Sequence, residues 1–186
     1  DKPQFDLAVH VAEDARAERV VVFGRELVVF GPGFRGGSQY ANVSMHSFAD
    51  PSDIRDVTAR DLTGDGAAEI VVRGSAKRKT DSGGMLSSDL TFIYTVKDGA
   101  PTRVFAIETS RELGEKRIQG SMQFVPQAGG KGFEMLVQAG RAFGWTEATY
   151  PFPEDKSGGA IEPILLPWGS TKSARYVWTG SAFERK

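Results

Sequence analysis

The chain has 186 residues, of which 40% are hydrophobic and 25% charged, and its formal net charge is −1. This length and composition indicate a folded protein with a core of its own. The near-neutral charge provides no global field that would draw the chain to nucleic acid or to a membrane surface. No apolar run approaches the roughly 18 residues of a membrane-spanning helix, so we expect no transmembrane span. Cysteine is absent, which both cytosolic and secreted proteins tolerate.

Short apolar runs separated by glycine and proline predict an all-β protein of antiparallel sheets. The expected strands, in chain order, are residues 5–11, 19–23, 26–30, 40–46, 57–60, 68–73, 90–97, 103–109, 121–125, 133–139, 142–148, 164–166, 174–178 and 182–185. Gly24-Arg25 and Asp98-Gly99 are the expected turns of two tight hairpins. Short helices are expected at 13–18 and 110–115, and polar loops at 80–88 and 154–159.

The segment 61–72 reads Asp-Leu-Thr-Gly-Asp-Gly-Ala-Ala-Glu-Ile-Val-Val. Oxygen-bearing side chains stand at positions 1, 3, 5 and 9 counted from Asp61, and a glycine at position 6 permits a sharp turn. Such a loop points alternate side chains inward and offers a backbone carbonyl at position 7, which suits a hard cation such as Ca²⁺. Position 12 is Val72 and the flanking residues are strand-like, so EF-hand and dockerin interpretations are disfavoured.

This segment resembles the calcium loop of FG-GAP/VCBS-type repeats, which build integrin α-subunit propellers and many secreted bacterial proteins. The resemblance implies that Asp61, Thr63, Asp65, the carbonyl of Ala67 and Glu69 are Ca²⁺ ligands. Thr63 and Glu69 depart from the family pattern, which usually has Asp or Asn at position 3 and Asp at position 9. The alternative is a metal-free turn in which Asp61 and Asp65 bond backbone amides.

A second segment, 121–140, repeats the pattern of 56–74 without the acidic ligands. Glu134-Met-Leu-Val stands 65 residues after Glu69-Ile-Val-Val, and Pro126-Gln-Ala-Gly-Gly-Lys takes the place of the acidic loop. We therefore expect a single β domain over residues 1–186, built from propeller-blade-like repeats or as a β-sandwich. Chance similarity between short alternating strands is the alternative.

The remaining motifs do not predict catalysis. The segment from Gly31 to Gly37 fits G-x-G-x-x-G, but a strand-like stretch follows it, so we expect a hairpin loop and not a dinucleotide site. A backbone nest for an anion, helped by Arg35, is the alternative. His10 and His46 fall in predicted strands without a local nucleophile, so no catalytic residue is assigned and we expect no hydrolytic or redox activity.

Aromatic residues gather in the last quarter of the chain. Trp145, Tyr150, Trp168 and Trp178 lie there among prolines. Such rings can form a surface that binds sugar rings or proline-rich segments. The alternative is that they fill the core of the C-terminal sheet.

Together these observations predict a non-catalytic binding or adhesion domain with one structural Ca²⁺ loop and a protein or glycan partner. We expect it outside the cytoplasm, whether secreted, periplasmic or at a cell surface, because weak Ca²⁺ sites fill where calcium is about millimolar. A first residue of Asp1 instead of Met fits a chain whose signal peptide has been removed. The alternative is a glycan- or peptide-binding module with an aromatic surface and a vestigial metal loop.

Overall fold

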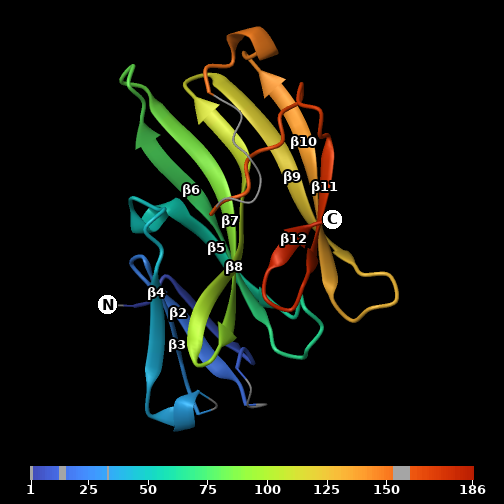
Figure 1. The fold of residues 1–186 in the computed structure, drawn as a ribbon. Helices are drawn as coiled ribbons and strands as arrows, with labels where there is room; N and C mark the ends of the chain where they lie inside the picture. Colours follow the sequence, from blue (N-terminus) through green and yellow to red (C-terminus); the bar gives the residue numbers. More distant parts are fainter. Residues whose placement is uncertain (1, 13–15, 33, 153–159) are drawn as a thin grey trace.

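The computed structural model describes residues 2–12, 16–32, 34–152 and 160–186. Strands dominate it, and they form one sheet of four strands and one of eight (Figure 1). Within each sheet, strands that follow one another in the chain pair in antiparallel fashion, so both sheets are simple meanders, and the chain passes from one sheet to the other between β4 and β5. The predicted all-β, antiparallel architecture is confirmed, and the two sheets form a sandwich-like arrangement instead of a closed barrel.

The smaller sheet contains β1 (Phe5–Val9), β2 (Glu18–Phe23), β3 (Glu26–Phe30) and β4 (Tyr40–Ser44). Its β2–β3 hairpin turns at Gly24, as expected, with φ of 57°. Buried valines and leucine line its inner face, whereas Phe30 and Tyr40 lie side by side on the outer face. After β3 the chain passes through a short 3₁₀ helix, η1 (Arg35–Gly37), into strand β4, so it forms the expected hairpin loop.

The larger sheet contains all the remaining strands. These are β5 (Ile54–Arg60), β6 (Glu69–Lys79), β7 (Met85–Lys97), β8 (Ala100–Leu113), β9 (Lys116–Pro126), β10 (Phe133–Phe143), β11 (Ser173–Trp178) and β12 (Phe183–Arg185). Asp98 and Gly99, with φ of 53° and 72°, make the predicted two-residue turn between β7 and β8. Two more 3₁₀ helices, η2 (Pro51–Asp53) and η3 (Glu147–Thr149), lie outside the sheets.

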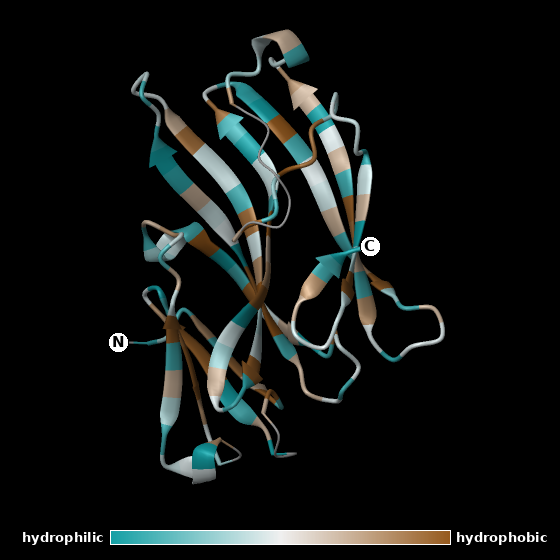
Figure 2. Cartoon of the chain, in the orientation of Figure 1, coloured by the Kyte–Doolittle hydropathy of each residue, from teal (hydrophilic) through white to brown (hydrophobic). Residues whose placement is uncertain are grey.

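Two apolar clusters cover opposite faces of β6, β7 and β8. One packs the smaller sheet against residues such as Ile70, Val72 and Phe92. The other packs Val71, Ile93 and neighbouring residues against β10 and β11, which fold back over the same strands. Because both faces are covered there, the first four residues of β6, from Glu69 to Val72, are all buried and show no apolar–polar alternation. Figure 2 shows the hydrophobic segments concentrated where the strands approach each other.

The strands fall into three successive groups of four, β1–β4, β5–β8 and β9–β12, each of which opens with a strand, a loop and a strand. A backbone hydrogen bond joins the opening loop of each group to that of the next. The amide of Ala68 donates to the carbonyl of His10 over 2.8 Å, and the amide of Phe133 donates to the carbonyl of Leu62 over 2.8 Å. The segments 56–74 and 121–140 are the first two strands of the second and third groups. Two such repeats are expected to lie in successive sheets, but both lie in the eight-stranded sheet because β8 and β9 stay paired.

Both helix predictions differ from the structure. The segment 110–115 is the end of β8 followed by a turn at Gly114, whose φ is 60°, because its main chain pairs with β9. In the segment 13–18, residues 13–15 lie outside the described part of the chain and Glu18 begins β2. Pairing with neighbouring strands thus overrides the local helix preference.

Several expected strands end earlier or run further in the structure, and three other segments differ more clearly. The segment 142–148, expected as a strand, leaves β10 at Phe143 and turns at Gly144, with φ of 70°, into η3. The segment 164–166 is buried in apolar clusters but belongs to no strand. The polar loop expected at 80–88 ends at Gly84, since β7 begins at Met85. The loop expected at 154–159 lies outside the described residues.

Candidate cation loop and adjacent groove

The loop between β5 and β6 is shaped by side chains that bond its own backbone. The carboxylate of Asp61 accepts hydrogen bonds from the amides of Gly64, at 2.7 Å, and Gly66, at 3.0 Å. Asp65 accepts one from the amide of Ala67 at 2.9 Å. These bonds are the ones raised above for a turn without metal. Each carboxylate oxygen that accepts one amide keeps a second lone pair for a cation.

Glu69 lies underneath this loop and is only 1% exposed. Its Oε2 accepts the amides of Leu62 at 2.7 Å and Thr63 at 3.1 Å, and the Thr63 hydroxyl lies 3.5 Å from Oε1. Burial raises the pKa of the Glu69 carboxyl to about 7, the two amides oppose that rise, and the charges of Asp65 and Asp61 add to it. Among the described residues, no positively charged side chain forms an ion pair with these three carboxylates.

A second buried glutamate, Glu18, accepts backbone amides of the loop between β1 and β2, as Glu69 does in its own loop. Glu18 is fully buried, and its Oε2 accepts the amides of Val11 at 2.9 Å and Ala12 at 3.3 Å. Its Oε1 and the nearby Nδ1 of His10 have no hydrogen-bond partner among the described residues. This site was not predicted from the sequence, because the loop lacks oxygen-bearing residues at the spacing of a cation loop. A glutamate just before a run of β-branched residues, as in Glu18 and Glu69, is the sequence feature that the two loops share. The glutamate therefore shapes the loop whether or not cation ligands accompany it.

The donor chemistry of loop 61–69 fits Ca²⁺, which takes six to eight oxygen ligands. Carboxylates, a hydroxyl and backbone carbonyls are all hard oxygen donors. As the side chains stand, no three Asp, Glu, His or Cys residues of the described chain converge closely enough to hold an ion. Ion binding would therefore draw Asp65 inward or exchange amide bonds of Asp61 and Glu69 for bonds to the ion.

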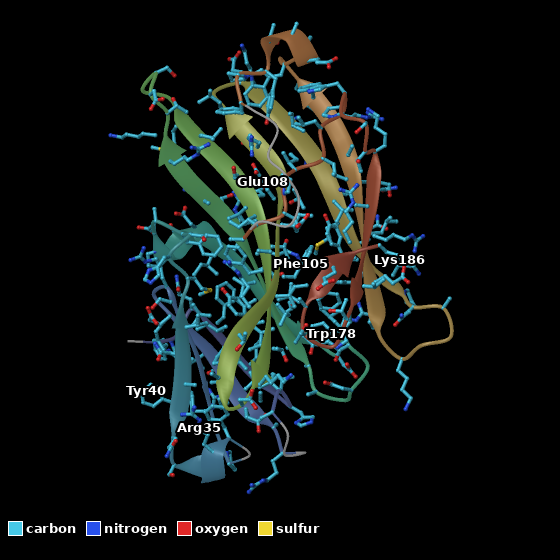
Figure 3. All side chains as sticks on the ribbon, viewed as in Figure 1. Arg35, Tyr40, Phe105, Glu108, Trp178 and Lys186 are labelled. Atoms are coloured by element: carbon cyan, nitrogen blue, oxygen red, sulfur yellow. The ribbon has the colours of Figure 1, made fainter. Side chains whose placement is uncertain are left out.

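A groove runs beside this loop, between β8 and the β11–β12 hairpin. The part nearest the loop has a volume of about 560 Å³, and Asp65, Ala67, His10 and Trp178 line it. A second part, of about 680 Å³, continues between residues 103–106 of β8 and residues 182–185 of the hairpin. Val104 borders both parts. Figure 3 labels Phe105 and Trp178 beside this gap. The structure thus brings two predicted cation-site residues together with one predicted aromatic ligand residue.

The other predicted aromatic residues lie elsewhere. Trp145, Tyr150 and Trp168 form one aromatic cluster with Phe152, in which Trp145 and Tyr150 have ring centroids 5.4 Å apart. Trp145 is only 5% exposed, which matches the core-packing alternative for that residue. Trp178 is half-buried and packs on Phe183, in a different apolar cluster. The four residues therefore do not form one continuous surface.

A buried ion pair, not foreseen from the sequence, lies on β8. The guanidinium of Arg111 donates to the carboxylate of Glu108 and to the hydroxyl of Tyr150, and the Ser88 hydroxyl also donates to Glu108. Both charged residues are almost inaccessible. The pair stands at the edge of a separate cavity of about 380 Å³, and its i,i+3 spacing carried no sequence signal of its own.

The chain matches no known protein-family model, no curated protein and no solved structure. Within the described residues, no helix combines the length and apolarity needed to cross a membrane. The resemblance of residues 61–72 to FG-GAP/VCBS loops therefore stays a prediction. Function has to be inferred from the loop and the groove themselves.

Proposed function

We propose that this chain is a non-catalytic ligand-binding or adhesion domain that acts outside the cytoplasm and is stabilised by Ca²⁺ in loop 61–69. The observation that carries this proposal is the uncompensated charge of the loop. Three carboxylates, those of Asp61, Asp65 and Glu69, belong to this loop, and no positively charged side chain of the described residues pairs with them. Burial raises the pKa of the Glu69 carboxyl to about 7, and the charges of Asp65 and Asp61 add to that rise. A divalent cation would neutralise this charge, and millimolar extracellular Ca²⁺ would fill even a weak site.

The proposed ligands are the three carboxylates, the hydroxyl of Thr63 and the carbonyl of Ala67. Asp65 and Ala67 also border the groove. An ion that fixes their positions would therefore fix one end of the groove before a ligand arrives, which lowers the entropic cost of binding. The loop has a structural role in this account, and the groove binds the partner.

Calorimetric titration of Ca²⁺ into the protein tests the cation site. We expect one site with a Kd near 0.1 mM in the intact chain, in the range of extracellular modules. Asp65→Asn should abolish the binding heat, whereas Asp81→Asn, an equal change of charge in the exposed turn before β7, should leave it intact. Equal binding by both variants would contradict the assignment.

A glycan-binding function is the second candidate, and the placement of Trp178 favours it. The half-buried ring borders the same groove as Asp65 and Ser181, an arrangement in which a sugar ring can stack while its hydroxyls bond polar groups. A glycan array with the intact chain and with Trp178→Ala tests this candidate. Glycan signals that survive the substitution would argue against this groove as their site.

A further inference from the structure

Strand β8 is paired along the whole of one edge but along only part of the other. Along one edge it pairs with β7 from Ala100 to Leu113, with two register shifts that leave Val104 and Thr109 without a directly opposite residue. Along the other edge it pairs with β9 only from Ser110 to Leu113, because β9 then turns away to form the second half of the sheet. Backbone amides and carbonyls on the rest of this edge have no neighbouring strand within the described part of the chain.

An extended segment already occupies the upper part of this edge. Glu162 forms a parallel bridge at Ile107, in which the amide of Glu108 donates to the carbonyl of Glu162 over 2.9 Å. In return the amide of Glu162 donates to the carbonyl of Ala106 over 2.8 Å. The edge therefore accepts main-chain hydrogen bonds from a segment that is not part of the sheet. Below this bridge, residues 102–105 have no such partner among the described residues.

The opposite wall of the groove is formed by another strand edge. β12 is the last strand of the larger sheet and pairs only with β11. Its residues and residues 103–106 of β8 line the same 680 Å³ cavity. Figure 1 shows the β11–β12 hairpin in red facing the lower half of β8. Two incompletely paired strands thus flank one groove.

We propose that this groove binds an extended peptide, which adds to the free edge of β8 below Glu162. Strand addition satisfies the backbone groups that the edge leaves unpaired, and an exposed edge is a template for such pairing. At about 3.3 Å per residue, the stretch from Thr102 to Phe105 accommodates roughly four residues of a bound strand.

The groove indicates which chemistry the peptide should carry. Basic residues (Lys97, Arg103 and Arg185) and acidic residues (Asp65, Asp98, Glu162 and Glu184) both border it, so net charge does not select the partner. Trp178 and Val104 provide apolar surface. Alternate side chains of a strand point to the same side, so we expect apolar residues at every second position of the peptide.

This inference rests on the proposed binding function and names the class of partner for it. It does not depend on occupancy of the cation loop, which borders only one end of the groove. The two claims can therefore fail separately, and measuring peptide binding both in EDTA and in Ca²⁺ distinguishes them.

The test begins with selection of random 12-residue peptides, displayed on phage, against the intact chain. Enriched peptides are synthesised, and their Kd is measured by fluorescence polarisation. Two matched variants carry the same substitution. Ala182→Trp fills the groove, whereas Ala148→Trp adds the same ring to the exposed η3 helix, away from the groove. Hydrogen exchange of the wild-type complex locates the bound peptide without any substitution in the protein.

We expect enriched peptides with alternating apolar residues that bind Ala182→Trp at least tenfold more weakly than wild type and Ala148→Trp equally well. The backbone amides of residues 102–105 that face the groove should exchange more slowly in the complex, whereas those that pair with β7 should not change. Methylating every second backbone nitrogen of the peptide should abolish binding when the methylated amides face β8. Methylating the other set of nitrogens should leave binding intact. The proposal is overturned if no peptide is enriched, if binding ignores Ala182→Trp, or if the protected amides lie elsewhere, for example around Tyr40.

Discussion

The pH dependence of stability should report directly on the buried carboxyl of Glu69. Its pKa is raised to about 7 in the folded protein, mainly by burial, whereas an unfolded chain leaves a glutamate near its usual value of roughly 4.3. The folded state therefore holds this proton more tightly than the unfolded state. The resulting stability is fully present below the unfolded pKa and is lost as the pH rises through about 7.

The difference between these two pKa values corresponds to roughly 4 kcal/mol of unfolding free energy, at 1.36 kcal/mol for each pKa unit, and about 3 kcal/mol of it should be lost between pH 5 and pH 8. Urea unfolding in EDTA, at intervals from pH 5 to pH 8, measures it. Glu69→Gln stays neutral across this range and keeps a carbonyl oxygen for the amide of Leu62, so its stability should change less with pH. Asp53 and Glu26, whose pKa values are lowered, act in the opposite sense and only at more acidic pH.

Two results bear on this reasoning. If wild type and Glu69→Gln lose stability in parallel between pH 5 and pH 8, then Glu69 does not titrate in that range. Saturating Ca²⁺ should reduce the wild-type loss, because a cation favours the ionised carboxylate. A wild-type slope that Ca²⁺ leaves unchanged would mean that the ion does not act at Glu69.

Substitutions at four other residues test the hydrogen bonding and packing of the fold. Glu18→Ala removes the acceptor of two buried amides and should cost roughly 2–4 kcal/mol in urea unfolding, with Glu18→Gln costing less; equal costs would contradict the bonding role. Gly140→Ala should prevent folding, since a Cβ there would lie 1.4 Å from the carbonyl oxygen of Gln119; a native circular-dichroism spectrum and melting curve would show that reasoning wrong. Trp145→Ala should cost roughly 3–5 kcal/mol because the ring is buried. Trp178→Ala should cost less because its ring is partly exposed, and the reverse order of melting temperatures would refute this.

Local sequence was sufficient to predict much of the fold. Runs of β-branched residues marked most strands, and Asp98-Gly99 predicted its turn because few residues adopt positive φ at low cost. The segment 110–115 was wrong because its helix-forming residues are held in β8 by pairing with β9, a contact that local propensity does not encode.

The candidate site was only partly predictable. The spacing of Asp61, Asp65 and Glu69 marked the loop, because ligand geometry is encoded within a few residues. The groove was not foreseen, since it arises where β9 turns away from β8, and that is a long-range feature. The sequence also did not predict that Trp145 is buried whereas Trp178 is partly exposed. Both lie in aromatic-rich segments near the C-terminus, and their burial depends on long-range packing.

Thermal unfolding in EDTA and in 1 mM Ca²⁺ tests most directly whether loop 61–69 is a calcium site. For a Kd near 0.1 mM, the ion should stabilise the protein by about 1.4 kcal/mol, which corresponds to a rise in Tm of roughly 3–6 °C for a chain of this size. Asp65→Asn should lose this rise and Asp81→Asn should keep it. An unchanged wild-type Tm would contradict the account and leave the loop as a turn held by its own amides.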